Sequence, residues 1–236
     1  DSLLVFMDTC GQRLATLGSG RFATVECVRL SDGSLVAVKT LKSSSLQARI
    51  QCMREIAIMR AVSEAPCPYI VQLLSAGRTL DDLKHGVCFA MVVGLGGPLH
   101  KHIQRANWDF STVRALTAEL LCALCALESV GCVHRDVKAS NCVLDQRGRL
   151  KLCDFGSAKM LPAPTHAHAN SDRDGDRGDL EPSAGAGASW AFTLLGTAPC
   201  MAPEVVAGAG YGASADYWSL GVLLYELLTG RLPAWE

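Results

Sequence analysis

The chain has 236 residues, of which 49% are hydrophobic, so it can bury one large core or two smaller cores that meet at a cleft. Its formal net charge of −1 shows no bias towards nucleic acid or a membrane surface, and we expect neither as a partner. No apolar run reaches the roughly 18 to 20 residues that span a bilayer, and residues 1–10 lack a signal-peptide pattern. We therefore expect a soluble, cytoplasmic protein without membrane insertion.

The eleven cysteines are scattered through apolar segments. An odd count in a chain without an export signal favours reduced, buried thiols over a disulfide framework. Cys122 and Cys125 form a CxxC pair, but they lie in a helical pattern rich in alanine and leucine, and no second pair stands at zinc spacing. We expect both thiols to pack in the core.

The first part of the chain is predicted to form a small antiparallel sheet with one helix. Residues 11–41 contain three β-rich runs, and residues 69–74 and 87–93 are two further strand candidates. Residues 46–62 switch to helical spacing. The apolar residues at this spacing are Leu46, Ile50, Met53, Ala57 and Val62. Together these elements predict a first lobe over residues 1–93.

Residues 94–98 contain three glycines and a proline, which break both periodicities and predict a hinge. The rest of the chain, residues 99–236, is expected to form a mainly helical second lobe. Its helix over residues 110–130 has one apolar face, made of Val113, Leu116, Leu120, Leu124 and Leu127. Residues 217–229 are apolar nearly all round, which predicts a fully buried helix. Residues 162–189 have the composition of a disordered segment.

One short stretch of the second lobe carries the chemistry of phosphoryl transfer. Asp136 can orient an attacking hydroxyl, and Lys138 can neutralise a moving phosphoryl group. Asn141 and Asp154 supply oxygen ligands of the kind that Mg²⁺ prefers. An anionic transition state without a covalent intermediate needs this combination, so the stretch predicts a phosphotransferase.

With these motifs in chain order, the sequence resembles the eukaryotic protein kinase family from about Leu14 to its last residues. The resemblance implies an α+β, two-lobed kinase fold, with an antiparallel sheet and one helix in the N-lobe and a mainly helical C-lobe. The family continues with further helices beyond the position of Glu236, so we expect the C-lobe to be incomplete. The implied activity is transfer of the ATP γ-phosphate to a protein hydroxyl, with ATP and Mg²⁺ as cofactors.

The resemblance also implies catalytic roles. Asp136 is the base that orients the substrate hydroxyl, Lys138 stabilises the transferred group, and Thr197 helps to position both. Lys39 and Glu55 form the ion pair that holds the α- and β-phosphates. In isolation this pair would be interpreted as a solvated strand-end lysine and a surface glutamate, but their order relative to the other motifs favours the catalytic interpretation. Asn141 and Asp154 are the implied Mg²⁺ ligands.

Residues 17–25 resemble the glycine-rich loop of the family, although Ala23 replaces its third glycine. Alone, a tight β-turn would explain this segment about as well. The resemblance implies an ATP site lined by Leu17, Gly18, Gly20, Val25, Ala37, Lys39, Val93, Leu95 and Val143. In that site Val93 guards the rear of the adenine slot. Cys153 is expected to face the same slot, either as an inert buried thiol or as a target for an electrophile.

Two features resemble serine/threonine kinases, namely Lys138 two residues after Asp136 and the Gly196-Thr197 pair. The resemblance is closest to the AGC group and its cyclic-nucleotide-dependent branch. By the same resemblance Thr193 is the activation-loop phosphosite, and Arg135 is the cation that receives its phosphate. The expected partners are protein substrates and an activating kinase. A pseudokinase or scaffold that keeps the fold, and a small-molecule kinase of related fold, are the alternative functions.

Overall fold

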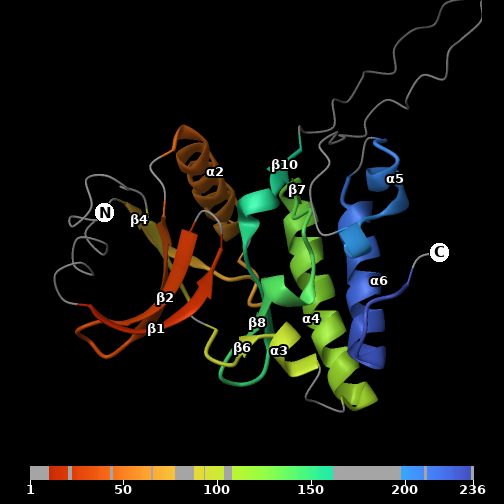
Figure 1. Ribbon diagram of the computed structural model, residues 1–236, viewed down its shortest axis with the longest axis horizontal. Coiled ribbons are helices and arrows are strands. Elements are labelled where there is room, and N and C mark those ends of the chain that lie inside the picture. Colours follow the sequence, from red (N-terminus) through yellow and green to blue (C-terminus); the bar gives the residue numbers. More distant parts are fainter. Residues whose placement is uncertain are drawn as a thin grey trace, which may run out of the picture.

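The protein consists of two lobes, one built on a five-stranded sheet and the other mainly helical (Figure 1). The computed structural model describes residues 11–20, 23–42, 45–64, 66–77, 88–92, 94–103, 108–161, 198–209 and 212–234. The segment predicted to be disordered, residues 162–189, lies outside these ranges.

The sheet of the first lobe is antiparallel, with the strand order β1-β2-β3-β5-β4. Its strands are β1 (Gln12–Ser19), β2 (Ala23–Arg29), β3 (Leu35–Leu41), β4 (Leu73–Gly77) and β5 (Cys88–Val92). A tight turn joins β2 to β3, because Gly33 adopts a φ of 84° and the Asp32 carboxylate accepts a hydrogen bond from the Ser34 amide at 2.8 Å. The predicted strand over residues 69–74 is displaced, because Ile70 pairs instead with Leu152 of the other lobe.

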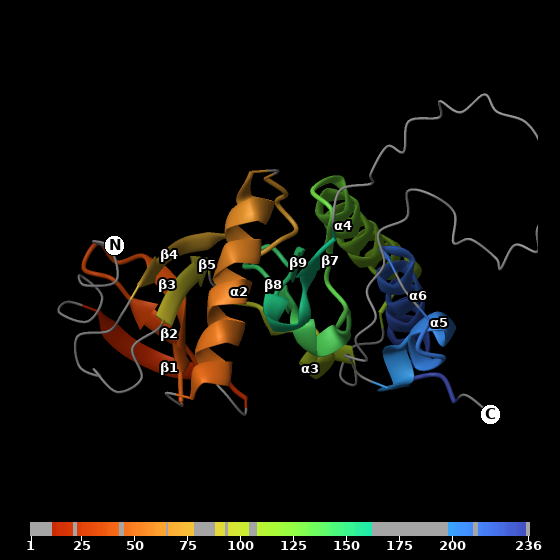
Figure 2. The ribbon, with the colours of Figure 1, turned by 90° about the horizontal axis from the view of Figure 1, so that it is seen from above.

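Helix α2 (Leu46–Ser63) lies between the sheet and the second lobe (Figure 2). The Ser45 hydroxyl caps it by accepting a hydrogen bond from the Ala48 amide. The predicted apolar face is wrong, since Leu46 and Met53 are 73% and 55% exposed and only Val62 of the five predicted residues is buried. Apolar residues occur on every side of α2, so spacing alone does not identify the buried side. The side chains that are buried belong to Ala48, Cys52, Glu55, Ile56, Ile58, Met59 and Val62.

The second lobe contains two long helices that pack against each other, α4 and α6 (Figure 1). Its helices are α3 (His100–Ile103), α4 (Phe110–Ser129), α5 (Pro203–Val206) and α6 (Ser214–Thr229). Its short strands are β6 (Gly97–Pro98), β7 (Cys132–Val133), β8 (Cys142–Leu144), β9 (Leu150–Leu152) and β10 (Lys159–Met160). The predicted apolar face of α4 is confirmed, because all five of its residues are buried.

Two predictions for the second lobe are wrong. Helix α6 is buried on one side only, since Tyr225 and Leu228 are 40% and 54% exposed. Cys122 and Cys125 are exposed on α4 instead of packing in the core. In both cases the described residues cover only one face of the helix. All the cysteines described by the structure are free thiols, which agrees with the expected reduced state.

By length and composition alone, α4 is long and apolar enough to cross a membrane, the one such helix in the described part of the chain. The expectation that no segment meets this criterion was therefore wrong. The core helix of a soluble domain passes the same test, and α4 buries Val113, Leu120 and Leu127 against its own lobe. This helix is consequently weak support for membrane insertion.

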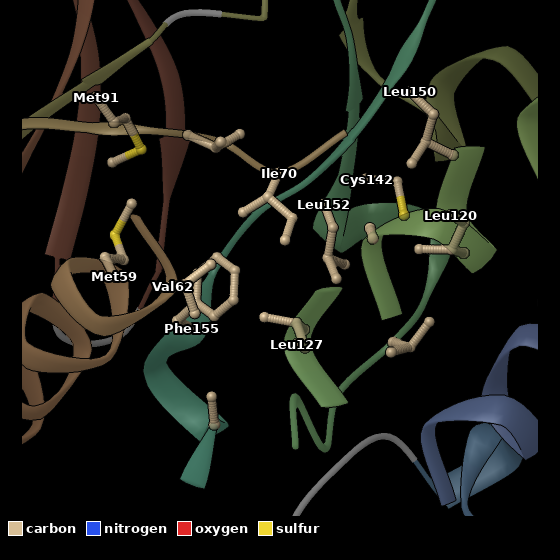
Figure 3. Packing of buried hydrophobic residues seen from close by; sticks show 14 of the residues in the cluster. Met59, Val62, Ile70, Met91, Leu120, Leu127, Cys142, Leu150, Leu152 and Phe155 are labelled. Atoms are coloured by element: carbon tan, nitrogen blue, oxygen red, sulfur yellow. The ribbon is translucent and has the colours of Figure 1, made fainter. Parts of the chain in front are cut away.

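A continuous apolar cluster joins the two lobes (Figure 3). Met59 of α2 and Phe155 lie at the end nearer the sheet, and Leu152 of β9 and Leu127 of α4 extend the cluster into the second lobe. Phe155 is 1% exposed, so its burial contributes about 2 kcal/mol of hydrophobic stabilisation. The lobes therefore share a core beneath the cleft.

A rear contact, made by residues 66–72 between α2 and β4, ties this loop to the second lobe. The Val71 amide donates to the Leu152 carbonyl at 2.9 Å, and the Leu152 amide donates to the Tyr69 carbonyl at 2.8 Å. The Lys151 ammonium donates to the Pro68 carbonyl at 2.6 Å. The loop that follows α2 is thus held on β9.

The hinge segment packs closely on strand β8. A Cβ atom on Gly94 would lie 2.6 Å from Cγ2 of Val143, and one on Gly96 would lie 2.9 Å from the Asp145 carbonyl oxygen. Both distances are shorter than real contacts, so these two positions require glycine. The glycines at this hinge are therefore needed for close approach, and not only to break the secondary structure.

Candidate active site

A cavity of about 670 Å³ lies between the lobes. Its roof comes from β1 to β3, its rear from α2 and β5, and its floor from the hinge, β8 and the start of the 3₁₀ helix that follows β9. Ten of the predicted site residues line it, namely Leu17, Gly18, Gly20, Val25, Ala37, Lys39, Glu55, Asn141, Val143 and Asp154. The lining residues come from segments far apart in the sequence, so the fold assembles them at one place.

An ion-pair group stands at the inner end of the cavity. The Lys39 ammonium lies 2.7 Å from Oε1 of Glu55 and 3.0 Å from Oδ1 of Asp154. Lys39 comes from the middle of β3, and Glu55 from the buried side of α2. The group therefore joins the sheet, the helix and the second lobe through three side chains.

Electrostatics keep Lys39 and Asp154 charged at neutral pH. Burial alone would lower the pKa of Lys39, but the carboxylates of Glu55 and Asp154 outweigh it and raise that pKa. Removal from water alone would raise the pKa of Asp154. The Lys39 ammonium outweighs this effect, and the pKa of Asp154 is therefore lowered. Burial also raises the pKa of Glu55, against the effect of Lys39. Lys39 is thus a cation with Asp154 as its anion, placed where polyanions and metal ions can enter.

The catalytic-loop residues form a second connected group. Oδ2 of Asp136 accepts a hydrogen bond from the Asn141 side-chain amide at 2.8 Å and lies 2.7 Å from the Lys138 ammonium. The same amide of Asn141 also donates to the Asp136 backbone carbonyl at 2.8 Å. Because its nitrogen is used in this way, the side-chain oxygen of Asn141 is left as an acceptor. Asp136 and Lys138 do not line the cavity, but they are bonded to Asn141, which does.

Asp216 anchors this loop from beneath. Its two carboxylate oxygens accept hydrogen bonds from the backbone amides of His134 and Arg135, at 2.7 and 2.8 Å. Arg135 adopts a φ of 68°, an uncommon conformation for a residue with a side chain, and these bonds compensate part of its cost. Burial raises the pKa of Asp216. Asp216 of α6 therefore fixes the backbone from which Asp136 projects.

Asp154 is presented by a strained turn. Its φ is 63°, and the 3₁₀ helix Phe155–Ser157 begins directly after it. Phe155 packs into the shared core with its ring centroid 5.1 Å from that of His134. Both His134 and Phe155 are buried. With Phe155 turned inward, Asp154 faces the cavity.

Several lining residues escaped the sequence analysis. Met91 of β5 is buried and lines the rear of the cavity, opposite Ala37 in the sheet. In the sequence, Met91 could have been found from its position near the end of the apolar strand that precedes the hinge glycines. Polar residues at the opening, His100 and Ser140, were also missed, because they belong to none of the motifs.

The remaining predicted site residues lie outside the described residues or away from the cavity. Val93, Thr193 and Thr197 lie outside the described residues. Leu95 is 41% exposed at the hinge and its side chain does not line the cavity. Nε of Arg135 donates to the Ser157 carbonyl, which places this predicted phosphate receptor beside the turn that follows Asp154.

The donor set suits a nucleotide with a hard divalent cation. Asp154 and Asn141 offer two oxygen donors, which fits Mg²⁺, because this ion takes one or two protein ligands together with substrate phosphates. Among the described residues no cluster of three or more His, Cys, Asp or Glu side chains could hold a metal alone. The apolar middle of the cavity, formed by Val25, Ala37 and Val143, fits a flat base. The residues present therefore fit ATP and Mg²⁺.

A two-lobed fold with a lysine–glutamate pair between sheet and helix, above a loop that carries Asp136 and Asn141, defines the protein kinase class. The protein kinase domain profile matches residues 12–236. The chain therefore belongs to the protein kinase family.

Its relatives are serine/threonine kinases of the AGC group, which confirms the group predicted from the motifs. The chain is 34% identical to the serine/threonine-protein kinase YPK1 of Saccharomyces cerevisiae, over 94% of this chain and 29% of the relative. It is 35% identical to a Drosophila melanogaster cGMP-dependent protein kinase, isozyme 2, over 93% of this chain and 21% of that relative. It is 32% identical to the human ribosomal protein S6 kinase-related protein, over 94% and 48%. The chain thus spans less than half the length of these relatives, and the branch within the group stays a prediction.

Proposed function

We propose that the protein is a serine/threonine kinase that transfers the γ-phosphate of ATP to a hydroxyl group of a protein. The observation that carries the proposal is the bridging position of Lys39, bonded at once to Glu55 and Asp154 inside the interlobe cavity. A cation held in this way has its charge directed at an anionic ligand. A second support is that Asp136, Lys138 and Asn141 are bonded to one another.

In the proposed reaction the protein supplies positioning and charge. Lys39 holds the nucleotide phosphates, and Asp154 and Asn141 hold Mg²⁺, which neutralises phosphate charge when bound. Asp136 accepts a hydrogen bond from the substrate hydroxyl and aligns it for attack. Lys138 lies 2.7 Å from Asp136 and stabilises the negative charge of the transferred group.

The alternative functions lack a supporting observation. A pseudokinase would be suggested by loss of one of these charged residues, and none of them is missing from the sequence. Its relatives carry protein kinase names, which supports protein substrates and the ATP and Mg²⁺ typical of this family. The activating kinase and the cytoplasmic location remain predictions.

The test is phosphate transfer from Mg-ATP to a peptide library by the full-length protein, compared with its Asp136→Asn variant. We expect turnover to fall by about 10² to 10⁴-fold in the variant while nucleotide binding is kept. Asp32→Asn, in the β2–β3 turn, is the matched control and should keep full turnover. Mg-ATP binding without any transfer by the unmodified protein would point to the pseudokinase instead.

A further inference from the structure

The turn that joins β1 to β2 covers the cavity but is held by little packing. Ser19 and Gly20, at the start of this turn, line the cavity. Every residue of β1 is exposed, and β1 is an edge strand of the sheet. Its pairing with β2 is also irregular, with a register shift between Thr16 and Gly18. The position of the turn therefore depends on hydrogen bonds more than on burial.

One side chain ties the turn to the rest of the sheet. Nζ of Lys42 lies 2.5 Å from Oγ of Ser19 and 2.9 Å from the carbonyl oxygen of Gly20, so the ammonium group donates to both. Within the turn, the Gly20 amide donates to the Ala23 carbonyl at 2.9 Å. In the part of the chain that the structure describes, no other side chain bonds to Ser19 or Gly20. Lys42 is therefore the side chain that fixes the turn.

Lys42 holds the turn from outside the cavity. Leu41, the last residue of β3, lines the cavity, and Lys42, which follows it, does not. Leu41 pairs with Ala23, the first residue of β2, and β2 lies between β3 and β1. The Lys42 side chain thus crosses the beginning of β2 to reach Ser19. A ligand in the cavity touches the turn and not the ammonium group, so Lys42 affects the contacts of the ligand through the position of the turn.

The turn lies at the charged end of the cavity. Strand β3 begins near the hinge, since Val36 pairs with Val92 at the end of β5. It ends at the turn, where Leu41 pairs with Ala23. Lys39 lies between these two pairs. A nucleotide with its base at the hinge therefore places its phosphates near Lys39 and beside the turn. If the turn moves away, the phosphates lose contacts and water enters the cavity.

We propose that Lys42 is a positioning residue for phosphoryl transfer, which holds the turn between β1 and β2 over the phosphates of the nucleotide. This inference rests on the proposed kinase function. Lys42 belongs to none of the catalytic motifs, and its role follows from the two bonds that it makes with Ser19 and Gly20.

The first measurement is hydrogen exchange of the full-length protein without nucleotide. In Lys42→Met the Gly20 amide should exchange about 2- to 5-fold faster, the ratio that one exposed charge-assisted hydrogen bond supports. Lys42→Arg keeps a cationic donor and should restore slow exchange. Equal exchange in Lys42→Met and the unmodified protein would overturn the inference and leave the kinase function untouched.

The second measurement compares the binding of adenosine and of Mg-ATP by calorimetry. Lys42→Met should bind adenosine as the unmodified protein does and Mg-ATP about 2- to 5-fold more weakly, because the turn meets only the phosphates. A general loss of structure would weaken the binding of both ligands and contradict the inference. Absence of Mg-ATP binding by the unmodified protein would instead overturn the proposed function together with this inference.

A further variant and a salt series separate positioning from simple attraction between charges. Ser19→Ala keeps the charge of Lys42 but removes one of its two acceptors, so it should show part of the loss in Mg-ATP affinity. The loss in Lys42→Met should persist in about 1 M salt, where charges are screened beyond roughly 3 Å. Normal binding by Ser19→Ala, together with a loss in Lys42→Met that vanishes in salt, would show charge attraction and overturn the inference.

The matched control is Arg13→Met, which also removes an exposed cation from the sheet. Arg13 lies at the other end of β1, where its guanidinium is 3.5 Å from the Glu26 carboxylate. This variant should keep both the exchange rate of the Gly20 amide and the Mg-ATP affinity of the unmodified protein. An effect as large as that of Lys42→Met would mean that any lost charge in the sheet suffices, which would also overturn the inference.

Discussion

Lys39 Nζ lies 2.7 Å from Oε1 of Glu55, and the two residues come from different elements, β3 and α2. Their side chains are 18% and 5% exposed, so the pair is largely removed from water. Because an unpaired charge at such a site is costly, the position of α2 relative to the sheet is coupled to the charge of Lys39.

Glu55→Gln should therefore impair the site without removing the helix. Loss of the charge leaves Lys39 with Asp154 alone and frees it to shift, and a misplacement of this kind reduces kcat/KM by roughly 100-fold. Glu64→Gln, at the exposed end of α2, is the matched control and should have no effect. Steady-state kinetics with Mg-ATP give kcat/KM for both variants. Equal kinetics for Glu55→Gln and the unmodified protein would show that the pair is dispensable.

Gly96→Ala should destabilise the protein. The added methyl group would lie 2.9 Å from two backbone carbonyl oxygens, of Leu144 and Asp145, and overpacking of this kind costs about 1 to 3 kcal/mol. Because the hinge must move, nucleotide affinity should fall as well. Gly221→Ala, on an exposed face of α6 with nothing near the new methyl group, should be neutral or stabilising by about 0.5 to 1 kcal/mol. Urea unfolding distinguishes the two, and equal stability of both variants would contradict the close approach of the hinge.

Asp216→Asn should loosen the catalytic loop. An asparagine oxygen can accept from only one of the two amides, of His134 or Arg135, and its own amide group would face the other donor. Leaving one buried amide unsatisfied costs about 1 to 3 kcal/mol of unfolding free energy. The measurement is hydrogen exchange of these two amides together with urea unfolding. Exchange as slow as in the unmodified protein would show that the anchor is not needed.

Thiol labelling should separate the exposed cysteines from those around the active site. Burial raises the pKa of Cys153 to about 12, and its Sγ donates to the Asn141 carbonyl at 3.2 Å. At pH 8 only about one molecule in 10,000 would then carry the reactive thiolate at Cys153. Of the two roles left open for Cys153, the inert thiol is therefore the expected one.

Iodoacetamide at pH 7 should accordingly modify Cys122 and Cys125, which are exposed on α4, and leave Cys153 unmodified. Raising the pH to 9 should still leave Cys153 unmodified, because this pH is below its pKa and the thiol stays mostly protonated. Mass spectrometry of peptides locates the label, and labelling in urea provides the positive control. Rapid modification of Cys153 in the folded protein would contradict this account.

The catalytic motifs were readable from the sequence because their chemistry depends on residue type and order, as at Asp136 and Asp154. The buried side of α2 was not, because Leu46 and Met53 have the spacing of a core face and only the packing of Glu55 and Met59 against the cleft selects the other side. The cavity residues Met91 and His100 likewise depend on how distant segments meet. The neighbours of His100 in the sequence carry no sign of it, and the only sign for Met91 is its place in the apolar strand before the hinge glycines.

The rear contact between residues 66–72 and β9 restricts how the two lobes can move. Together with the hinge it gives two backbone connections between the lobes, so a rotation that opens the cavity and keeps both must have an axis passing near them. The C-terminal end of α2 lies close to such an axis and the N-terminal end lies far from it. Any opening of the protein would therefore swing the first turns of α2 outward while its last turn stays in place.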